Sequence, residues 1–75
     1  MQKQQWEKYR QLGLNIAFYR KQRGLSQLQL AEKIDISRTH MSRIETAECA
    51  ASLDVVFHIC DALKVSPGKL FDFRE

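Results

Sequence analysis

Apolar residues recur along the chain at steps of three and four, the spacing of one face of an α-helix. Glycine and proline are scarce, with three glycines and one proline in 75 residues. A first helix is therefore predicted from about residue 4 to residue 22. Its predicted inward stripe consists of Trp6, Tyr9, Leu12, Ile16 and Tyr19. Gly24 is expected to supply the left-handed residue that ends this helix.

Capping signals predict that a second helix begins at Ser26. Serine is a favourable N-cap, and Gln29 follows three residues later, as a capping box requires. Leu25, just before the cap, can pack on Leu30 as a hydrophobic staple. The helix is predicted to extend to about residue 34 and to bury Leu30, Ala31 and Ile34.

A turn at Asp35 and Ile36 separates this helix from a third one, which Ser37 caps and which extends to residue 45. On a helical wheel at 100° per residue, Met41 and Ile44 mark the buried side. The arc from about 60° to 200° away from Met41 is polar. It contains Arg38, Thr39, Ser42, Arg43 and Thr46. The third helix thus has one buried side and one broad polar side.

Two further helices are predicted in the last third of the chain. Ser52 caps a fourth helix that ends near Lys64, and Ser66 with Pro67 begins a short fifth helix. The fourth helix is predicted to bury Leu53, Val56, Phe57, Ile59, Cys60 and Leu63, and the fifth carries Leu70 and Phe71. Segment 46–51 has no clear pattern. The fold class expected is all-α, a compact five-helix domain.

Length and composition set the outer limits. A chain of 75 residues with 44% hydrophobic content suits a single small domain spanning residues 1–75. No run of about eighteen apolar residues is present to cross a bilayer, and the start MQKQQWEKYRQ is too polar for a secretory signal. We therefore expect a cytoplasmic protein that does not enter a membrane.

The charges are distributed unevenly. Up to residue 43 there are nine Lys or Arg residues against three acidic ones, and from residue 44 there are three against six. A basic half suits a polyanionic partner. A solvated helix face accounts for the charge pattern equally well, so charge alone does not decide between the two.

Neither a metal site nor an enzyme is expected. Cys49 and Cys60 are more consistent with free thiols than with a disulfide, since no export signal is present. His58 and Cys60 stand two residues apart on a helix, so they point about 160° away from each other and do not suit zinc together with His40 and Cys49. No phosphate-binding glycine loop and no nucleophile paired with a base is found. Neither metal nor cofactor is predicted.

Two capped helices joined by a short turn, the second with a polar face, describe a helix-turn-helix. The stretch LSQLQLAEKIDISRTHMSRIE resembles the phage-repressor and Cro-like helix-turn-helix family, often called the Xre family, with the motif at about 26–45. The motif-core positions are Leu30, Ala31, Ile34, Ile36, Met41 and Ile44. The similarity continues in LGLNIAFYRKQRG and SLDVVFHICDALKVSPGKLF. It implies a lambda-repressor-like fold with the motif in helices two and three.

The resemblance also implies a function. Proteins of this family bind double-stranded DNA in a sequence-specific manner as transcriptional regulators, and repression is the expected sign. The helix at about 37–45 would lie in the major groove. The implied contact residues are Gln27, Ser37, Arg38, Thr39, Ser42 and Arg43. Gln27 and Ser37 match phosphate contacts. Arg38, Thr39, Ser42 and Arg43 match the contacts of the family to base edges and phosphates.

Several positions depart from the family pattern or need a partner. Asp35 stands where a turn glycine is usual, and Ala47 and Ala51 stand where a glycine and a proline are common. Glu45 is directed toward the core, and the resemblance implies that Arg20 pairs with it. Leu28 occupies a usually polar place, which can mark a partner surface.

The resemblance implies a homodimer at cytoplasmic, nucleoid-associated DNA, because one such helix spans few base pairs. The sequence leaves two alternative surfaces for the dimer contact. One is the fourth and fifth helices with Val55, Leu70, Phe71 or Phe73, and the other is the N-terminal segment with Trp6 and Tyr9. The alternative function is a protein-interaction module or an antitoxin-type partner on the same fold, with weak or no DNA binding.

Overall fold

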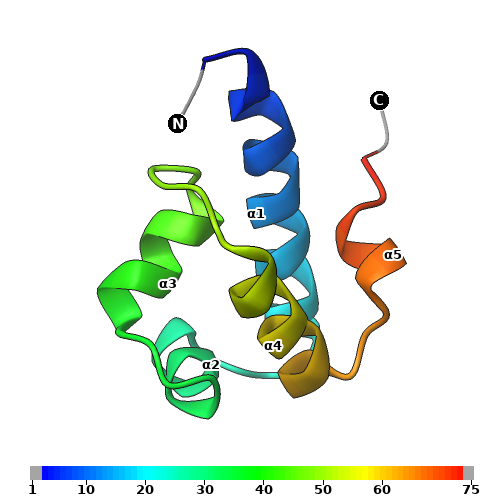
Figure 1. The fold of residues 1–75 in the computed structure, drawn as a ribbon. Helices are drawn as coiled ribbons and strands as arrows, with labels where there is room; N and C mark the ends of the chain where they lie inside the picture. The colour runs from blue at the N-terminus through cyan, green and yellow to red at the C-terminus, as the bar shows by residue number, and fades with distance from the viewer. Residues whose placement is uncertain (1–2, 74–75) are drawn as a thin grey trace.

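The computed structural model describes residues 3–73, in which five α-helices follow a short 3-10 turn (Figure 1). The elements are η1 (Lys3–Gln5), α1 (Trp6–Gln22), α2 (Gln27–Lys33), α3 (Arg38–Glu45), α4 (Leu53–Leu63) and α5 (Pro67–Leu70). In Figure 1, α2 and α3 lie on one side of the long helix α1 and α5 lies on the other, with α4 in front. The all-α, five-helix prediction is confirmed.

Serine side chains begin three of the helices as predicted. Ser26 Oγ accepts a hydrogen bond from the Gln29 backbone N–H at 3.0 Å, and Gln29 Oε1 accepts one from the Ser26 N–H at 2.8 Å. The Ser37 and Ser52 hydroxyls cap α3 and α4 by accepting hydrogen bonds from the His40 and Val55 backbone N–H groups. Each cap stabilises its helix by about 1 kcal/mol. Ser66 precedes α5 but makes no side-chain cap bond, so only Pro67 marks that start.

The core lies where α1, α2, α3, α4 and α5 meet. Its buried apolar residues are Leu12, Ile16, Leu30, Ala31, Met41, Ile44, Val56, Ile59, Cys60, Leu63 and Leu70. The predicted stripes are therefore correct in their central parts.

The predicted stripes are wrong at three positions. Trp6 is 41% exposed at the first turn of α1, with the Arg10 guanidinium 5.8 Å from its ring centre. Leu53 and Phe57 on α4 are 61% and 46% exposed. Phe57 stands about 100° around the helix from the buried Val56 and Leu53 about 60°, so both lie at the margin of the buried face.

Helices α1 to α4 each end in a turn of the same type. A left-handed residue stands two positions after α1, α2 and α3 and one position after α4, with φ of 73° at Gly24, 60° at Asp35, 61° at Ala47 and 56° at Lys64. In each case the next N–H bonds back to the helix, as in the bond from Glu48 N to Arg43 O at 2.8 Å. The expected turns at Gly24 and Asp35 are confirmed. Ala47 adopts a conformation that favours glycine, and its methyl group is buried, which offsets part of the cost.

Both cysteines are free thiols, with Cys60 buried in α4 and Cys49 half-buried in the loop before it. Burial raises the pKa of the Cys60 thiol, and the neighbouring Asp61 carboxylate raises it further. Within residues 3–73 no three metal-ligating side chains are grouped, and no helix of this part is long and apolar enough to cross a membrane.

Candidate nucleic-acid interface

Helix α3 presents one side to the core and the other to solvent. Met41 and Ile44 are buried where α3 packs against α1 and α2. On the outer side Arg38, Thr39 and Arg43 are exposed and Ser42 is half-buried, with the capping Ser37 exposed at the start of the helix. Five of the six residues expected to contact DNA therefore lie on or directly before one short helix at the edge of the molecule (Figure 1).

The two arginines on this outer side are Arg38 and Arg43. Among the described residues, neither makes a side-chain hydrogen bond or an ion pair. Each guanidinium carries five N–H donors in a planar fork that suits phosphate oxygens and the edge of guanine. An unpaired guanidinium on a helix held by its opposite face is free to bind an external acceptor.

The sixth residue, Gln27, is placed differently. It is the first residue of α2 and is half-buried, and its side-chain Nε2 donates to Glu45 Oε1 at 3.0 Å. The sequence pattern indicated an exposed amide at the start of a helix. It did not reveal that this amide is bonded to the last residue of α3.

Glu45 also pairs with Arg20, as the family resemblance implied. Arg20 Nε donates to Glu45 Oε2 at 2.7 Å and Arg20 Nη2 to Oε1 at 3.0 Å. The third nitrogen, Nη1, donates to the Leu25 carbonyl at 2.8 Å. Arg20 is 8% exposed and Glu45 7%, so this is a buried two-bond ion pair that joins α1 to the end of α3.

A glycine allows α1 to approach α3 this closely. A Cβ atom at Gly13 would overlap the Glu45 carbonyl oxygen and lie 2.8 Å from the Ile44 carbonyl oxygen. Real Cβ atoms essentially never come this near to backbone. We refer to Gly13, Arg20, Gln27, Ile44 and Glu45 as the polar junction.

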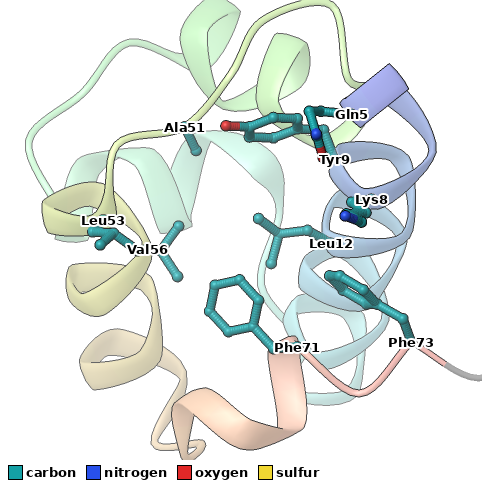
Figure 2. Close-up of a pocket in the computed structure, with 9 residues that line it drawn as sticks. All are labelled: Gln5, Lys8, Tyr9, Leu12, Ala51, Leu53, Val56, Phe71 and Phe73. Carbon is teal, nitrogen blue, oxygen red and sulfur yellow. The ribbon is translucent and has the colours of Figure 1, made fainter. Parts of the chain in front are cut away.

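A second feature lies on another side of α1. A groove of about 410 Å³ opens between α1, α4 and the C-terminal segment. Figure 2 shows the Phe71 ring directed into the space between Leu12 and Val56. We call it the aromatic groove, and its main walls are Tyr9, Leu12, Leu53, Val56, Phe71 and Phe73.

The aromatic groove combines parts of the two dimer surfaces expected from the sequence. Tyr9 comes from the N-terminal surface, and Phe71 and Phe73 from the C-terminal one. Leu70, expected at the C-terminal surface, is instead fully buried. Trp6 does not line the groove.

One side chain fastens the C-terminal wall of the aromatic groove. Asn15 Nδ2 donates to the Leu70 carbonyl at 2.8 Å and to the Asp72 carbonyl at 3.2 Å. Asn15 projects from α1 and does not line the groove itself. The position of Phe71 and Phe73 thus depends on a residue outside the groove.

A model of the helix-turn-helix family matches residues 16–70, which is more than half of the chain. The chain belongs to the helix-turn-helix family. The phage-repressor-like resemblance of the sequence is thereby confirmed. The match supports a DNA-binding transcription regulator, a class of protein that is not an enzyme.

Several solved structures share this arrangement of helices. The restriction-modification controller protein C.AhdI from Aeromonas hydrophila is 26% identical, with a TM-score of 0.84 over 88% of this chain and 100% of that one. The hypothetical transcription factor NHTF from Neisseria is 26% identical, with a TM-score of 0.82 over 87% and 73%. The clp gene regulator ClgR from Corynebacterium glutamicum, 24% identical over 83% and 80% with a TM-score of 0.79, supports the fold alone. No curated protein sequence matches the chain significantly.

In this helix-turn-helix protein the motif consists of α2, the turn around Asp35, and α3. Sequence reasoning missed two features of the polar junction: the hydrogen bond from Gln27 to Glu45, and the close approach of α1 to α3 at Gly13. A glycine inside an otherwise regular helix was the available signal for the second, because such a glycine often marks a tight helix contact. No local signal pointed to the first.

Proposed function

We propose that the protein binds double-stranded DNA in a sequence-specific manner, with α3 in the major groove, and that it represses transcription by occupying a promoter. One observation carries this proposal. Arg38 and Arg43 are exposed and unpaired within the described residues, on a helix whose other side is fixed in the core. The helix-turn-helix match supports it. Such a role would put the protein at the nucleoid, in the cytoplasm.

The proposed contacts follow from the chemistry of each side chain. Arg38 and Arg43 bind guanine O6 and N7 in a bidentate manner, and Thr39 contacts a thymine methyl or a base acceptor. Ser37, Ser42 and Gln27 contact backbone phosphates and fix the register of α3.

We further propose that the protein acts as a homodimer. One recognition helix spans few base pairs, so two copies bind half-sites about one helical turn apart. The aromatic groove supports this, because it exposes the apolar side chains of Leu53 and Phe71, which a second copy of the chain can cover in a two-fold arrangement.

Selection of bound duplexes from a random library, followed by affinity measurements, tests the proposal. We expect the affinity to fall at least about tenfold between 50 and 200 mM salt, because neutralised phosphates release counterions. Arg38→Ala and Arg43→Ala should each reduce the free energy of binding to the selected duplex by about 1–3 kcal/mol and relax the base preference at one position of the site. Lys69→Ala serves as the control, because Lys69 is on α5, which lies on the other side of α1 from α3 (Figure 1). This variant should keep the sequence preference.

The alternative, a protein-interaction module or antitoxin-type partner, has one observation in its favour. Leu14 and Phe18 are exposed one turn apart on α1, outside the aromatic groove. If no duplex is selected, or if binding is insensitive to salt, DNA binding is overturned and the protein-partner function is favoured.

A further inference from the structure

The Glu45 carboxylate accepts three side-chain hydrogen bonds from two other helices. Two come from Arg20 on α1, and the third comes from Gln27 Nε2 on α2, at 3.0 Å to the same Oε1 that accepts Arg20 Nη2. Because Glu45 is 7% exposed and its partners hold both oxygens, the carboxylate has one fixed position. It therefore provides a fixed acceptor for the Gln27 amide.

A fixed acceptor determines which end of a glutamine amide faces which way. The amide has a carbonyl oxygen, which only accepts, and an NH2 group with two N–H donors. An ionised carboxylate only accepts hydrogen bonds, so the NH2 group must face Glu45 and the carbonyl oxygen must face away. One N–H is used by Glu45, and the other has no acceptor among the described residues.

The second N–H of the Gln27 amide is a suitable hydrogen-bond donor to a phosphate. Phosphate oxygens accept hydrogen bonds, and they would repel the carbonyl end of a rotated amide. Gln27 is half-buried while Glu45 is buried, so the amide group is partly open to solvent although its acceptor is not.

We infer that Glu45 is a positioning residue for DNA binding, which orients the Gln27 amide so that its second N–H is presented to a backbone phosphate. This inference rests on the proposed function and deepens it. The buried Arg20–Glu45 pair then has two roles, since it joins α1 to α3 and also sets the donor that meets the phosphate.

A double-mutant cycle in duplex affinity tests the coupling. Gln27→Ala in the native background should lower affinity about tenfold, the range for a hydrogen bond to a charged group. Arg20→Met with Glu45→Met replaces the buried pair by apolar side chains of similar length, a change that such pairs often tolerate. In that background the amide is free to rotate, and Gln27→Ala should lower affinity less than about twofold.

The salt dependence provides a second readout. A neutral amide releases no counterion, so Gln27→Ala should leave the slope of log affinity against log salt unchanged, whereas loss of a phosphate-binding Arg or Lys reduces it by about one. Equal losses from Gln27→Ala in both backgrounds would overturn the positioning role while leaving DNA binding intact. Absence of duplex binding by the native protein would instead overturn the proposed function itself.

The native protein allows a test that does not depend on the folding of a variant. The two side-chain amide protons of Gln27 give separate NMR signals. On titration with a selected duplex, the proton bonded to Glu45 should keep its shift and its slow exchange, and the other should move downfield. If both protons remain unshifted in the saturated complex, Gln27 does not contact phosphate and the inference is wrong.

Discussion

The polar junction and the aromatic groove both use α1, yet they are built in opposite ways. At the junction α1 meets backbone at Gly13, and every buried side-chain nitrogen or oxygen of the described residues has a hydrogen-bond partner. The groove is open, mainly apolar, and exposes Leu53 and Phe71. The junction is thus complete within one chain, whereas the groove is the surface at which we propose that a second copy binds.

The largest expected effect comes from breaking the ion pair of the junction. Glu45→Ala leaves the buried Arg20 guanidinium without its carboxylate, and we expect the free energy of unfolding to fall by about 3–5 kcal/mol. Denaturant unfolding measures this. The control Glu32→Ala removes an exposed carboxylate on α2 and should change stability by less than about 0.5 kcal/mol. A loss below about 1 kcal/mol for Glu45→Ala would contradict a buried pair.

Adding one methyl group at the junction should be the next most damaging change. Gly13→Ala forces α1 away from the carbonyl oxygens of α3, and we expect a loss of about 1–3 kcal/mol in spite of the better helix propensity of alanine. Gly68→Ala is the matched control, because nothing lies within 4 Å of the added Cβ. It should be neutral or slightly stabilising in thermal unfolding. Equal behaviour of the two variants would mean that the helices are not in close contact.

The left-handed turns after α3 and α4 should respond differently to glycine, because one of the two residues is buried and the other is exposed. Lys64 is exposed at φ of 56°, so Lys64→Gly relieves backbone strain and should stabilise the fold by about 0.5–1 kcal/mol. Ala47→Gly relieves similar strain but also removes a buried methyl group, worth about 0.8 kcal/mol, so its gain should be smaller. Parallel urea titrations would show the difference, and a larger gain at Ala47 would mean that its methyl group contributes nothing.

A substitution in the groove should have the smallest effect on folding. Leu53 is 61% exposed, so Leu53→Ser should change the unfolding free energy by about 0.5 kcal/mol or less. The same change should weaken self-association, which sedimentation would detect. Leu14→Ser, at 47% exposure outside the groove, is the control and should associate like the native protein. A native protein that stays monomeric at high micromolar concentration would rule out the dimer.

Local signals in the sequence predicted the elements well. Ser26, Ser37 and Ser52 cap their helices as expected, because capping depends on residues only three apart. The Arg20–Glu45 pair was also predicted, although from the family resemblance and not from spacing. The DNA contacts of α3 remain a prediction, since their test requires a duplex.

Features set by the distance and angle between helices could not be predicted. Periodicity assigned Trp6 and Phe57 to buried faces, but it does not determine how far along or around a helix its neighbours reach. For the same reason the N-terminal and C-terminal surfaces were treated as alternatives. Tyr9 and Phe73 stand far apart in the sequence, and only the packing of the C-terminal segment on α1 brings them to one groove.

The carboxamide of Asn15 holds the backbone of residues 70–72 against α1 without lining the groove that this segment shapes. A substitution of Asn15 would therefore alter the proposed dimer surface from a position that bonds to the backbone on either side of Phe71 and takes no part in α3. A homologue with a different side chain at this position would keep the proposed DNA contacts of α3, but its groove would bind a different protein surface.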